Sequence, residues 1–290
     1  MGDKSKIAWT DATWNPVTGC SKISAGCTHC YAERTDKRLR GAAGQAWREW
    51  SASNAKYNVR LHPERFDQPL RWKKPRMIFV NSMSDLFHPQ VSDWIIYRLF
   101  EVMRDAPQHT FQILTKRPER ALKFFERNWA LTQTPGISFG GGFIGLPLPN
   151  VWFGVSVEHQ KAAERRIPLL LQIPAAVRFV SCEPLLDNVN LDVWMQYTHP
   201  KTWIASGLIH WVIAGGESGP NARPMRPDWA RSLRDDCLKS QVPFFFKQWG
   251  RWMPMPGEPD RLIASPQNEH DIPLLDGKAW TEFPRLQPIA

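Results

Sequence analysis

The sequence predicts an α/β protein, a partial or closed (β/α) barrel similar to a TIM barrel. Short apolar runs of strand length alternate with segments of helical periodicity along most of the chain. This alternation implies parallel strands joined by right-handed crossovers. Polar or charged residues follow the runs, and the carboxyl ends of barrel strands form the active-site face. About seven strands are expected, which suits a barrel better than a small doubly wound sheet.

The expected barrel occupies most of the chain. With 290 residues, 42% of them hydrophobic, the chain is long enough for one large domain. We assign the barrel to residues 1–250, with an insertion at about 41–75 and a cysteine-bearing loop after the first strand. Residues 251–290 are rich in proline and are expected to form an irregular tail.

The strands and helices are expected in a regular order. An extended segment over 10–18 comes first, and apolar runs predict further strands at 77–81, 110–115, 151–156, 177–181, 210–214 and 243–246. Helical periodicity predicts helices over 31–38, 92–104, 118–128, 160–171 and 228–239. Thr28 is expected to cap the first helix. Cys30 would then lie in the first turn, where free N–H groups favour a thiolate.

Three of the five cysteines are clustered. Cys20, Cys27 and Cys30 follow the pattern C-x6-C-x2-C, and no fourth cysteine lies nearby. A structural zinc site needs four ligands. Three cysteines can hold a 4Fe-4S cluster if a small molecule binds the fourth iron, as in S-adenosylmethionine radical chemistry. The pattern therefore indicates a metal site, with a radical enzyme and a structural metal both open.

Composition indicates a cytoplasmic protein. The first residues are polar and lack the apolar core of a signal peptide. No apolar run approaches the ~20 residues that span a bilayer. Clustered cysteines in a reducing compartment bind metal more often than they form disulfides.

The chain is strongly basic, with a formal net charge of +9. A charge of this sign favours a polyanionic partner such as nucleic acid. The run Arg71-Trp72-Lys73-Lys74-Pro75-Arg76 combines cations with an aromatic side chain and is a candidate phosphate contact. A solvated connector before the next strand is the alternative reading of this run.

The residues that follow the predicted strands are the other candidate functional groups. They are Asn81, Ser82, Ser84 and Asp85, then Lys116 and Arg117, then Glu158, then Glu183, then Glu217, and finally Lys247 and Gln248. Each carboxylate could instead cap a helix or pair with a neighbouring cation. Because all recur at one topological position, we expect them to line the active-site face.

The sequence lacks the motifs of several other enzyme classes. The chain contains no G-x-x-x-x-G-K-[ST] phosphate loop, no H-E-x-x-H and no G-x-S-x-G. A barrel hydrolase that uses the carboxylates remains open as a third interpretation.

The sequence resembles a bacteriophage and prophage protein family known by its three-cysteine motif. Seven blocks carry the resemblance over about residues 5–252: WNPVTGC with the two later cysteines, FVNSMSDLFH, FQILTKRPER, GVSVE, RFVSCEPLL, AGGESGPNARP and FFFKQWG. That family is similar to radical S-adenosylmethionine enzymes, distantly to spore photoproduct lyase. The resemblance implies a dedicated partner protein encoded nearby, and radical chemistry implies an electron donor.

These inferences assign roles within one hypothesis. A 4Fe-4S cluster is expected on Cys20, Cys27 and Cys30, with S-adenosylmethionine on its fourth iron. Cofactor contacts are assigned to Asn81, Ser82, Ser84, Asp85, Lys116 and Arg117, and catalytic or substrate contacts to Glu158, Glu183, Glu217 and Lys247. The expected substrate is a nucleic-acid base, in modification or repair. The alternative is a non-catalytic nucleic-acid-binding or partner-scaffolding phage protein with a structural metal.

Overall fold

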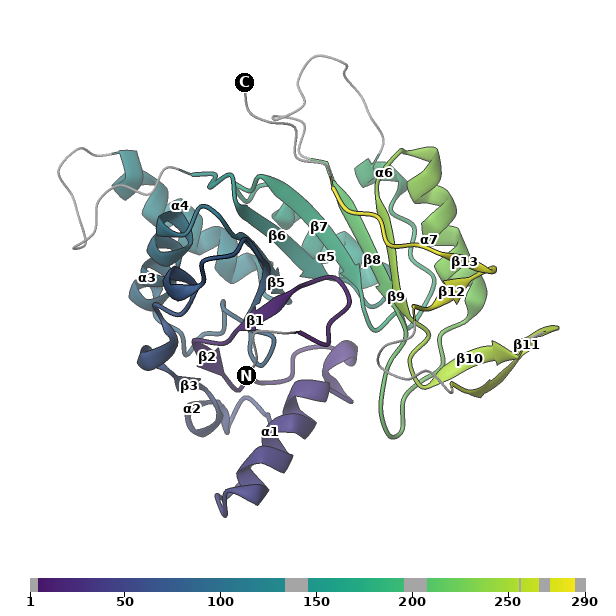
Figure 1. The fold of residues 1–290 in the computed structure, drawn as a ribbon, viewed down its shortest axis with the longest axis horizontal. Coiled ribbons are helices and arrows are strands. Elements are labelled where there is room, and N and C mark those ends of the chain that lie inside the picture. The colour runs from purple at the N-terminus through teal and green to yellow at the C-terminus, as the bar shows by residue number, and fades with distance from the viewer. Residues whose placement is uncertain (1–4, 134–145, 196–207, 256, 266–271, 285–290) are drawn as a thin grey trace. The chain divides into compact units, whose positions relative to one another are not determined.

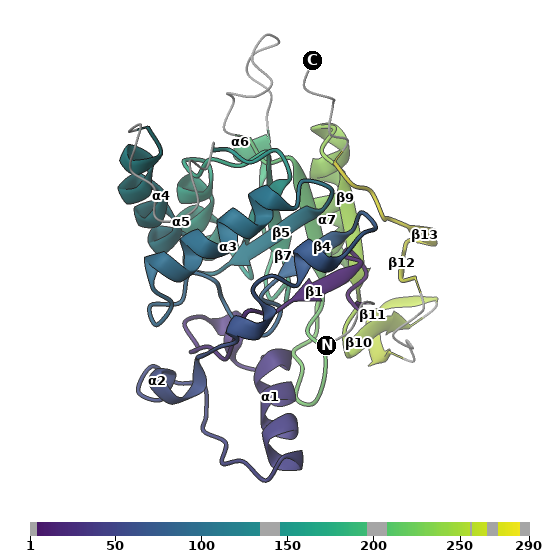
Figure 2. The same cartoon turned by 60° about the vertical axis from the view of Figure 1, so that its left-hand side comes forward.

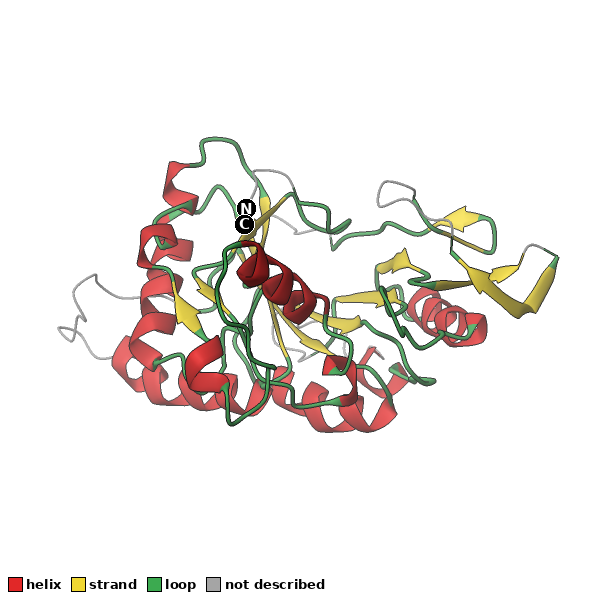
Figure 3. Ribbon diagram, turned by 90° about the horizontal axis from the view of Figure 1, so that it is seen from below, coloured by secondary structure: helices red, strands yellow, loops and turns green. Residues whose placement is uncertain are grey.

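The computed structural model describes residues 5–133, 146–195, 208–255, 257–265 and 272–284, which form a mixed α/β protein (Figure 1). Strands and helices alternate along much of the chain (Figure 3), so the predicted α/β class is confirmed. The chain divides into two compact units, Met1–Val155 with Gln172–Ala176, and Ser156–Leu171 with Val177–Ala290. Within the described ranges, no helix is long and apolar enough to cross a bilayer.

Parallel strands form the centre of the first unit. They are β1 (Ala12–Trp14), β4 (Met77–Val80), β5 (Thr110–Thr115) and β6 (Val151–Ser156), hydrogen-bonded in that order. Only the last residue of β6 belongs to the second unit. The register aligns Trp14, Val80, Ile113 and Phe153 in one row, and each is at most 1% exposed. Burial of such a row explains why these strands read as continuous apolar runs.

Two helices of the first unit contribute an aromatic core. Helix α3 (Asp93–Asp105) begins after Ser92, whose hydroxyl accepts the Ile95 N–H at 3.4 Å, and α4 (Pro118–Gln133) begins at a proline (Figure 2). Their aromatic side chains meet those of β6 and of the loop after β4. The cluster comprises Phe87, Phe100, Phe124, Phe125 and Phe153, with ring centroids 5.3–6.3 Å apart in the pairs that touch.

The segment between β1 and β4 consists of short elements and one longer helix. They are β2 (Val17–Thr18), the 3₁₀ turn η1 (Ala25–Cys27), α1 (Tyr31–Ala42), α2 (Ala55–Asn58), β3 (Arg60–Leu61), and the 3₁₀ turns η2 (Pro63–Arg65) and η3 (Pro69–Arg71). Strand β3 pairs antiparallel with β2, so the predicted insertion at 41–75 returns to the cysteine-bearing segment. The N-cap of α1 is Cys30 and not Thr28, because the Thr28 hydroxyl donates to the Ala25 carbonyl instead.

The second unit has its own parallel strands. They are β7 (Val177–Cys182), β8 (Trp211–Gly215) and β9 (Phe244–Gln248), and the register aligns Val180, Val212 and Phe244, which are all fully buried. The helices are α5 (Gln160–Leu170), α6 (Asp192–Met195) and α7 (Pro227–Lys239). Helix α7 packs against β8 and β9.

The C-terminal segment is more regular than its proline content indicated. It contains the hairpins β10 (Trp252–Met255) with β11 (Glu258–Ala264), and β12 (Leu274–Leu275) with β13 (Lys278–Ala279). Residues after β13 then pair with β9: the Phe246 N–H donates to the Trp280 carbonyl at 2.8 Å. Trp280 is also nearly buried against Phe244. Long-range pairing, which composition does not encode, orders this part of the tail.

The aromatic core gives a stability prediction. Replacing Phe153 with Ala removes a fully buried ring that touches Phe87 and Phe125. We expect the free energy of unfolding in urea to fall by about 3–5 kcal/mol. The control is Trp94→Ala, because Trp94 is 56% exposed and its loss should change the same quantity by about 0.5 kcal/mol or less. Equal effects of the two substitutions would contradict this core assignment.

Candidate functional site

The three clustered cysteines lie on one short segment of the first unit. Cys20 follows β2, Cys27 is the last residue of η1, and Cys30 is the N-cap of α1. Each is partly exposed and has a free thiol. This segment joins the strands to α1, so each thiol is placed by a different local element.

Gly19 determines the position of Cys20. Its φ of +83° lies in the left-handed region, and a Cβ at this position would lie 1.9 Å from the Asn58 carbonyl oxygen. The Gly19 N–H donates to the Met83 carbonyl at 2.8 Å. Ser84 also donates its hydroxyl to the Gly19 carbonyl, at 2.7 Å. Both backbone groups of Gly19 are therefore held by the turn after β4.

A buried ion pair between Asp85 and Arg117 lies beside this segment. The Arg117 Nη1 and the Asp85 Oδ2 are 2.9 Å apart, and the two side chains are 9% and 8% exposed. Asp85 also accepts hydrogen bonds from the Thr115 hydroxyl and from the backbone N–H groups of Phe87 and Lys116. These donors satisfy both carboxylate oxygens, which a buried charge requires.

Arg117 connects this ion pair to the first cysteine. Its Nη2 donates to the Ser21 carbonyl at 2.9 Å and to the Ser21 hydroxyl at 3.2 Å, while its Nη1 donates to the Cys20 Sγ at 3.5 Å. The pKa of Arg117 is raised because Asp85 and Cys20 outweigh the opposing effect of burial. Arg117 therefore remains a cation while it holds the backbone at Ser21.

His88 completes the contacts of Ser21. Burial, assisted by the nearby Arg117, lowers the pKa of His88 to about 4, so its ring is neutral near pH 7. The Gln90 N–H donates to Nδ1, which places the ring proton on Nε2. That Nε2–H then donates to the Ser21 hydroxyl oxygen, 2.9 Å away. A neutral histidine and a charged arginine thus share one serine oxygen.

The predicted cofactor residues after β4 also contact the N-terminal segment. Asn81 has a positive φ of 59° and accepts the Val17 N–H on its side-chain oxygen at 3.2 Å. Ser82 exchanges hydrogen bonds with the Asn15 side chain at 3.1–3.2 Å. The structure therefore brings these residues to the segment that precedes the cysteines, where Asn81 bonds to the backbone and Ser82 to the Asn15 side chain.

The three thiols differ in acidity. Burial raises the pKa of Cys20 to about 11, against the lowering effect of Arg117. Burial also raises the pKa of Cys30, with partial opposition from the backbone amides of Glu33 and Ala32 and from Lys116. The pKa of Cys27 is lowered, because Lys116 and hydrogen bonds from Ile23 and Ser24 outweigh its burial. The Lys116 ammonium therefore favours the thiolate at two of the three positions.

Three cysteine thiols on one segment have the donor chemistry of an iron–sulfur site. In the described part of the chain, no group of three Cys, His, Asp or Glu side chains is gathered in a way that could hold one metal ion. The thiolates of an iron–sulfur cluster bind different irons, so they need not converge on one point. Three partly exposed thiols on one segment, with a cation near two of them, suit this requirement.

The second unit contains the predicted carboxylates. Glu158 is 1% exposed, and its carboxylate lies 2.7 Å from the Arg166 guanidinium, which also donates to the Ser156 carbonyl at 2.7 Å. Glu217 is 5% exposed and binds Arg223 through both oxygens, at 2.6 and 3.0 Å. Both carboxylates are held by arginines in charge-assisted hydrogen bonds.

Glu183, Lys247 and Gln248 form a third group in this unit. Glu183 and Lys247 make a short ion pair, and their side chains are 18% and 17% exposed. The Gln248 amide donates to the same carboxylate oxygen at 3.3 Å. This group is more accessible than the other two carboxylates, so it is the better placed of the three to meet a substrate.

Sequence reasoning missed two groups of residues. Ser21 and Thr115 carry no chemical signature, and only the fold brings Ser21 to Arg117 and Thr115 to Asp85. The position of Arg166 could have been recognised from the sequence. It lies three or four residues from Ala162, Ala163 and Leu170, on the apolar face of α5. A charged residue on such a stripe predicts a buried partner.

The buried ion pair gives a second prediction. Arg117→Met leaves the Asp85 carboxylate buried without its cation, so we expect the free energy of unfolding to fall by about 3–5 kcal/mol. The double variant Arg117→Met/Asp85→Leu should recover part of this loss, since no charge is then stranded. Arg127→Met is the matched control, because Arg127 is 71% exposed. An Arg117→Met protein as stable as the control in urea would contradict the assigned role.

Comparison with known proteins gives one match. No curated protein and no solved structure matches this chain. One family model matches residues 4–284, and its description is "Protein of unknown function (DUF5131)". The match includes all three clustered cysteines and every candidate residue named above. The chain therefore belongs to the DUF5131 family.

Proposed function

We propose that this chain is a radical S-adenosylmethionine enzyme that holds a 4Fe-4S cluster on Cys20, Cys27 and Cys30. We assign it a partial (β/α) barrel of the TIM type. The observation that carries the proposal is the anchored cysteine segment, in which the buried Asp85–Arg117 pair fixes Ser21 next to the first thiol. Such anchoring suits a cofactor that must be held in one position.

The cofactor supplies chemistry that side chains cannot. Held by Cys20, Cys27 and Cys30, a 4Fe-4S cluster would pass one electron from the external donor to S-adenosylmethionine, which would give methionine and a 5′-deoxyadenosyl radical able to remove a hydrogen atom from a substrate. The residues of the chain have supporting tasks. Lys116 favours the thiolate form of Cys27, and its positive charge partly offsets the negative charge of the three thiolates. Its ammonium is the group we assign to the carboxylate of S-adenosylmethionine.

The turn after β4 has a positioning role in this proposal. Asn81, Ser84 and Asp85 each bond to the cysteine-bearing segment or to Arg117. These residues therefore act on the cofactor through the loop that they hold. The Ser82 hydroxyl and backbone are similarly engaged, with Asn15 and with the Tyr31 hydroxyl.

We assign substrate contacts to the second unit. The Glu183–Lys247–Gln248 group combines a carboxylate, an ammonium and an amide, and is partly exposed. These groups match the donor and acceptor edges of a nucleic-acid base. The net charge of +9 supports a polyanionic substrate. We therefore propose base modification or repair in nucleic acid, with an external electron donor.

A non-catalytic scaffold with a structural metal is the second candidate. The observation that favours it is the pairing of Glu158 and Glu217 with their own arginines, as expected for structural carboxylates. The partly exposed Glu183 group argues for the enzyme, since a scaffold does not require it.

Metal analysis of anaerobically purified protein tests the proposal. After reconstitution we expect about four irons and four sulfides per chain, and the dithionite-reduced protein should release 5′-deoxyadenosine from S-adenosylmethionine. Cys27→Ala should lose the cluster because one of three ligands is missing. Cys237→Ala should keep it, because Cys237 is a fully buried cysteine of the second unit.

Two results would contradict the proposal. Stoichiometric zinc without iron would favour the scaffold. Iron that persists in Cys27→Ala would show that the ligands are assigned incorrectly.

A further inference from the structure

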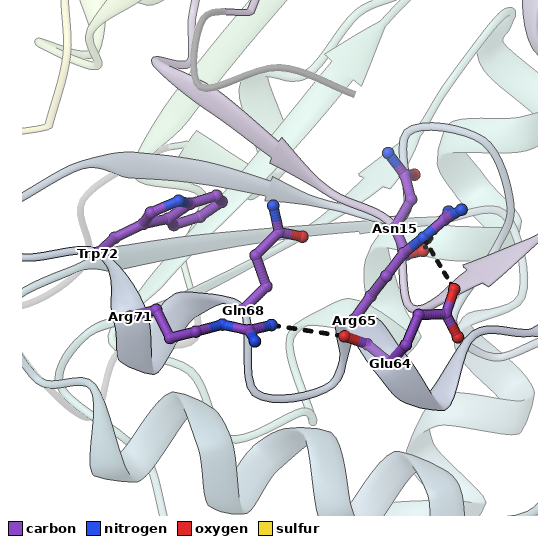
Figure 4. Close-up of a pocket in the computed structure, with 6 residues that line it drawn as sticks. All are labelled: Asn15, Glu64, Arg65, Gln68, Arg71 and Trp72. Carbon is purple, nitrogen blue, oxygen red and sulfur yellow. Dashed lines mark hydrogen bonds and ion pairs between the residues drawn. The ribbon is translucent and has the colours of Figure 1, made fainter.

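A polar cavity of about 450 Å³ lies in the first unit, and among its lining residues Asn15 contacts a residue of the proposed cofactor site, Ser82. It is lined by Asn15, Glu64, Arg65, Gln68, Arg71 and Trp72 (Figure 4). Five of these six residues come from η2, η3 and the residues that flank η3. The volume lies within the roughly 300–1,000 Å³ of small-ligand sites.

The lining combines cations with a hydrogen-bonding amide. Arg65 and Arg71 provide two guanidinium groups and Glu64 one carboxylate. The Arg65 Nε lies 3.4 Å from the Glu64 carboxylate (Figure 4), so Arg71 supplies the net positive charge of the lining. Arg71 is exposed and uses one nitrogen to donate to the Glu64 carbonyl, at 3.4 Å. Figure 4 shows the Gln68 amide between the Trp72 ring and the Arg65 and Asn15 side chains. Guanidinium groups match phosphate oxygens, and an amide can both donate to and accept from a base edge.

The basic run continues directly from this cavity. Arg71 and Trp72 line it, and Lys73 and Lys74 follow as exposed cations. Arg76 lies over the Trp72 ring at 4.8 Å, so the nearly buried indole acts as a wall with a second cation against it. An anionic chain that enters the cavity would therefore meet further positive charge along this run.

We propose that this cavity receives one nucleotide of a single-stranded nucleic acid, with the neighbouring phosphates on Arg71, Lys73 and Lys74. A base pair stacked in a duplex cannot enter a pocket, whereas an unpaired nucleotide can. The amide of Gln68 would contact the base, and the guanidinium of Arg71 would contact a phosphate. The proposal goes beyond the proposed function, because this binding needs neither a cluster nor S-adenosylmethionine.

Fluorescence anisotropy of labelled oligonucleotides tests the inference on the full-length chain. The probes are single-stranded DNA and single-stranded RNA of roughly 12 nucleotides, and a duplex of the same length. We expect both single strands to bind more tightly than the duplex, and the DNA and RNA arms distinguish the sugar. Measurements between about 50 and 200 mM salt give the number of phosphate contacts.

Matched variants localise the binding. Arg71→Ala should weaken it about fivefold and reduce the salt slope by about one, as expected for one lost phosphate contact. Gln68→Glu, which keeps the shape but adds a negative charge, should weaken it at least as much. Lys123→Ala is the control, because it removes an exposed cation on α4 and should leave the affinity unchanged.

Each remaining result overturns the inference. The inference is wrong if the protein does not bind single strands, or if it binds the duplex with equal affinity. It is also wrong if the Arg71→Ala and Gln68→Glu proteins bind as tightly as Lys123→Ala. The Cys27→Ala protein should bind as the wild type does. A wild-type protein that binds single strands but forms no 5′-deoxyadenosine would count against the proposed function alone. A wild-type protein that forms 5′-deoxyadenosine but binds no single strand would count against this inference alone.

Discussion

The Asp85–Arg117 ion pair is the interaction on which the first unit's candidate site depends. Burying two charges is unfavourable unless each has enough hydrogen-bond partners. Here the partners come from the residues after β4, from β5 and from the cysteine-bearing segment. The ion pair therefore joins three parts of the chain that are far apart in sequence. Movement of the segment next to Cys20 would take both Ser21 acceptors away from the Nη2 group of this buried guanidinium, which explains how so short a loop keeps one position.

The same principle appears in the second unit. Glu158 and Glu217 are buried, and each is held by an arginine from within eight residues along the chain. Local pairing of this kind stabilises the loops that follow strands, whatever chemistry they serve. The Glu183–Lys247 pair differs, because it links the residue after β7 to β9 and remains partly exposed. The degree of burial therefore distinguishes Glu158 and Glu217, which support the fold, from Glu183, which is accessible to a ligand.

The segment between β1 and β4 has two functions in this picture. Its Trp50 holds both ends of the cysteine region: the Lys22 N–H donates to the Trp50 carbonyl, and the Trp50 N–H donates to the Glu33 carboxylate. Its later part, η2 and η3, lines the polar cavity. This segment therefore supports one candidate site and lines another. Its short elements leave backbone and side-chain polar groups available for contacts, whereas a single long helix would use most backbone groups in its own hydrogen bonds.

The sequence was sufficient to predict the order of the main parallel strands and the longer helices, and the residues that follow those strands. These features depend on local periodicity, which a chain carries wherever it folds. The contacts that the residues after each strand make depend on the tertiary structure. Nothing local indicates that Arg117 would bond to Ser21, or that the proline-rich tail would pair with β9 through Trp280. Hydrogen bonds and ion pairs join residues tens of positions apart, so their partners exist only after the strands have assembled.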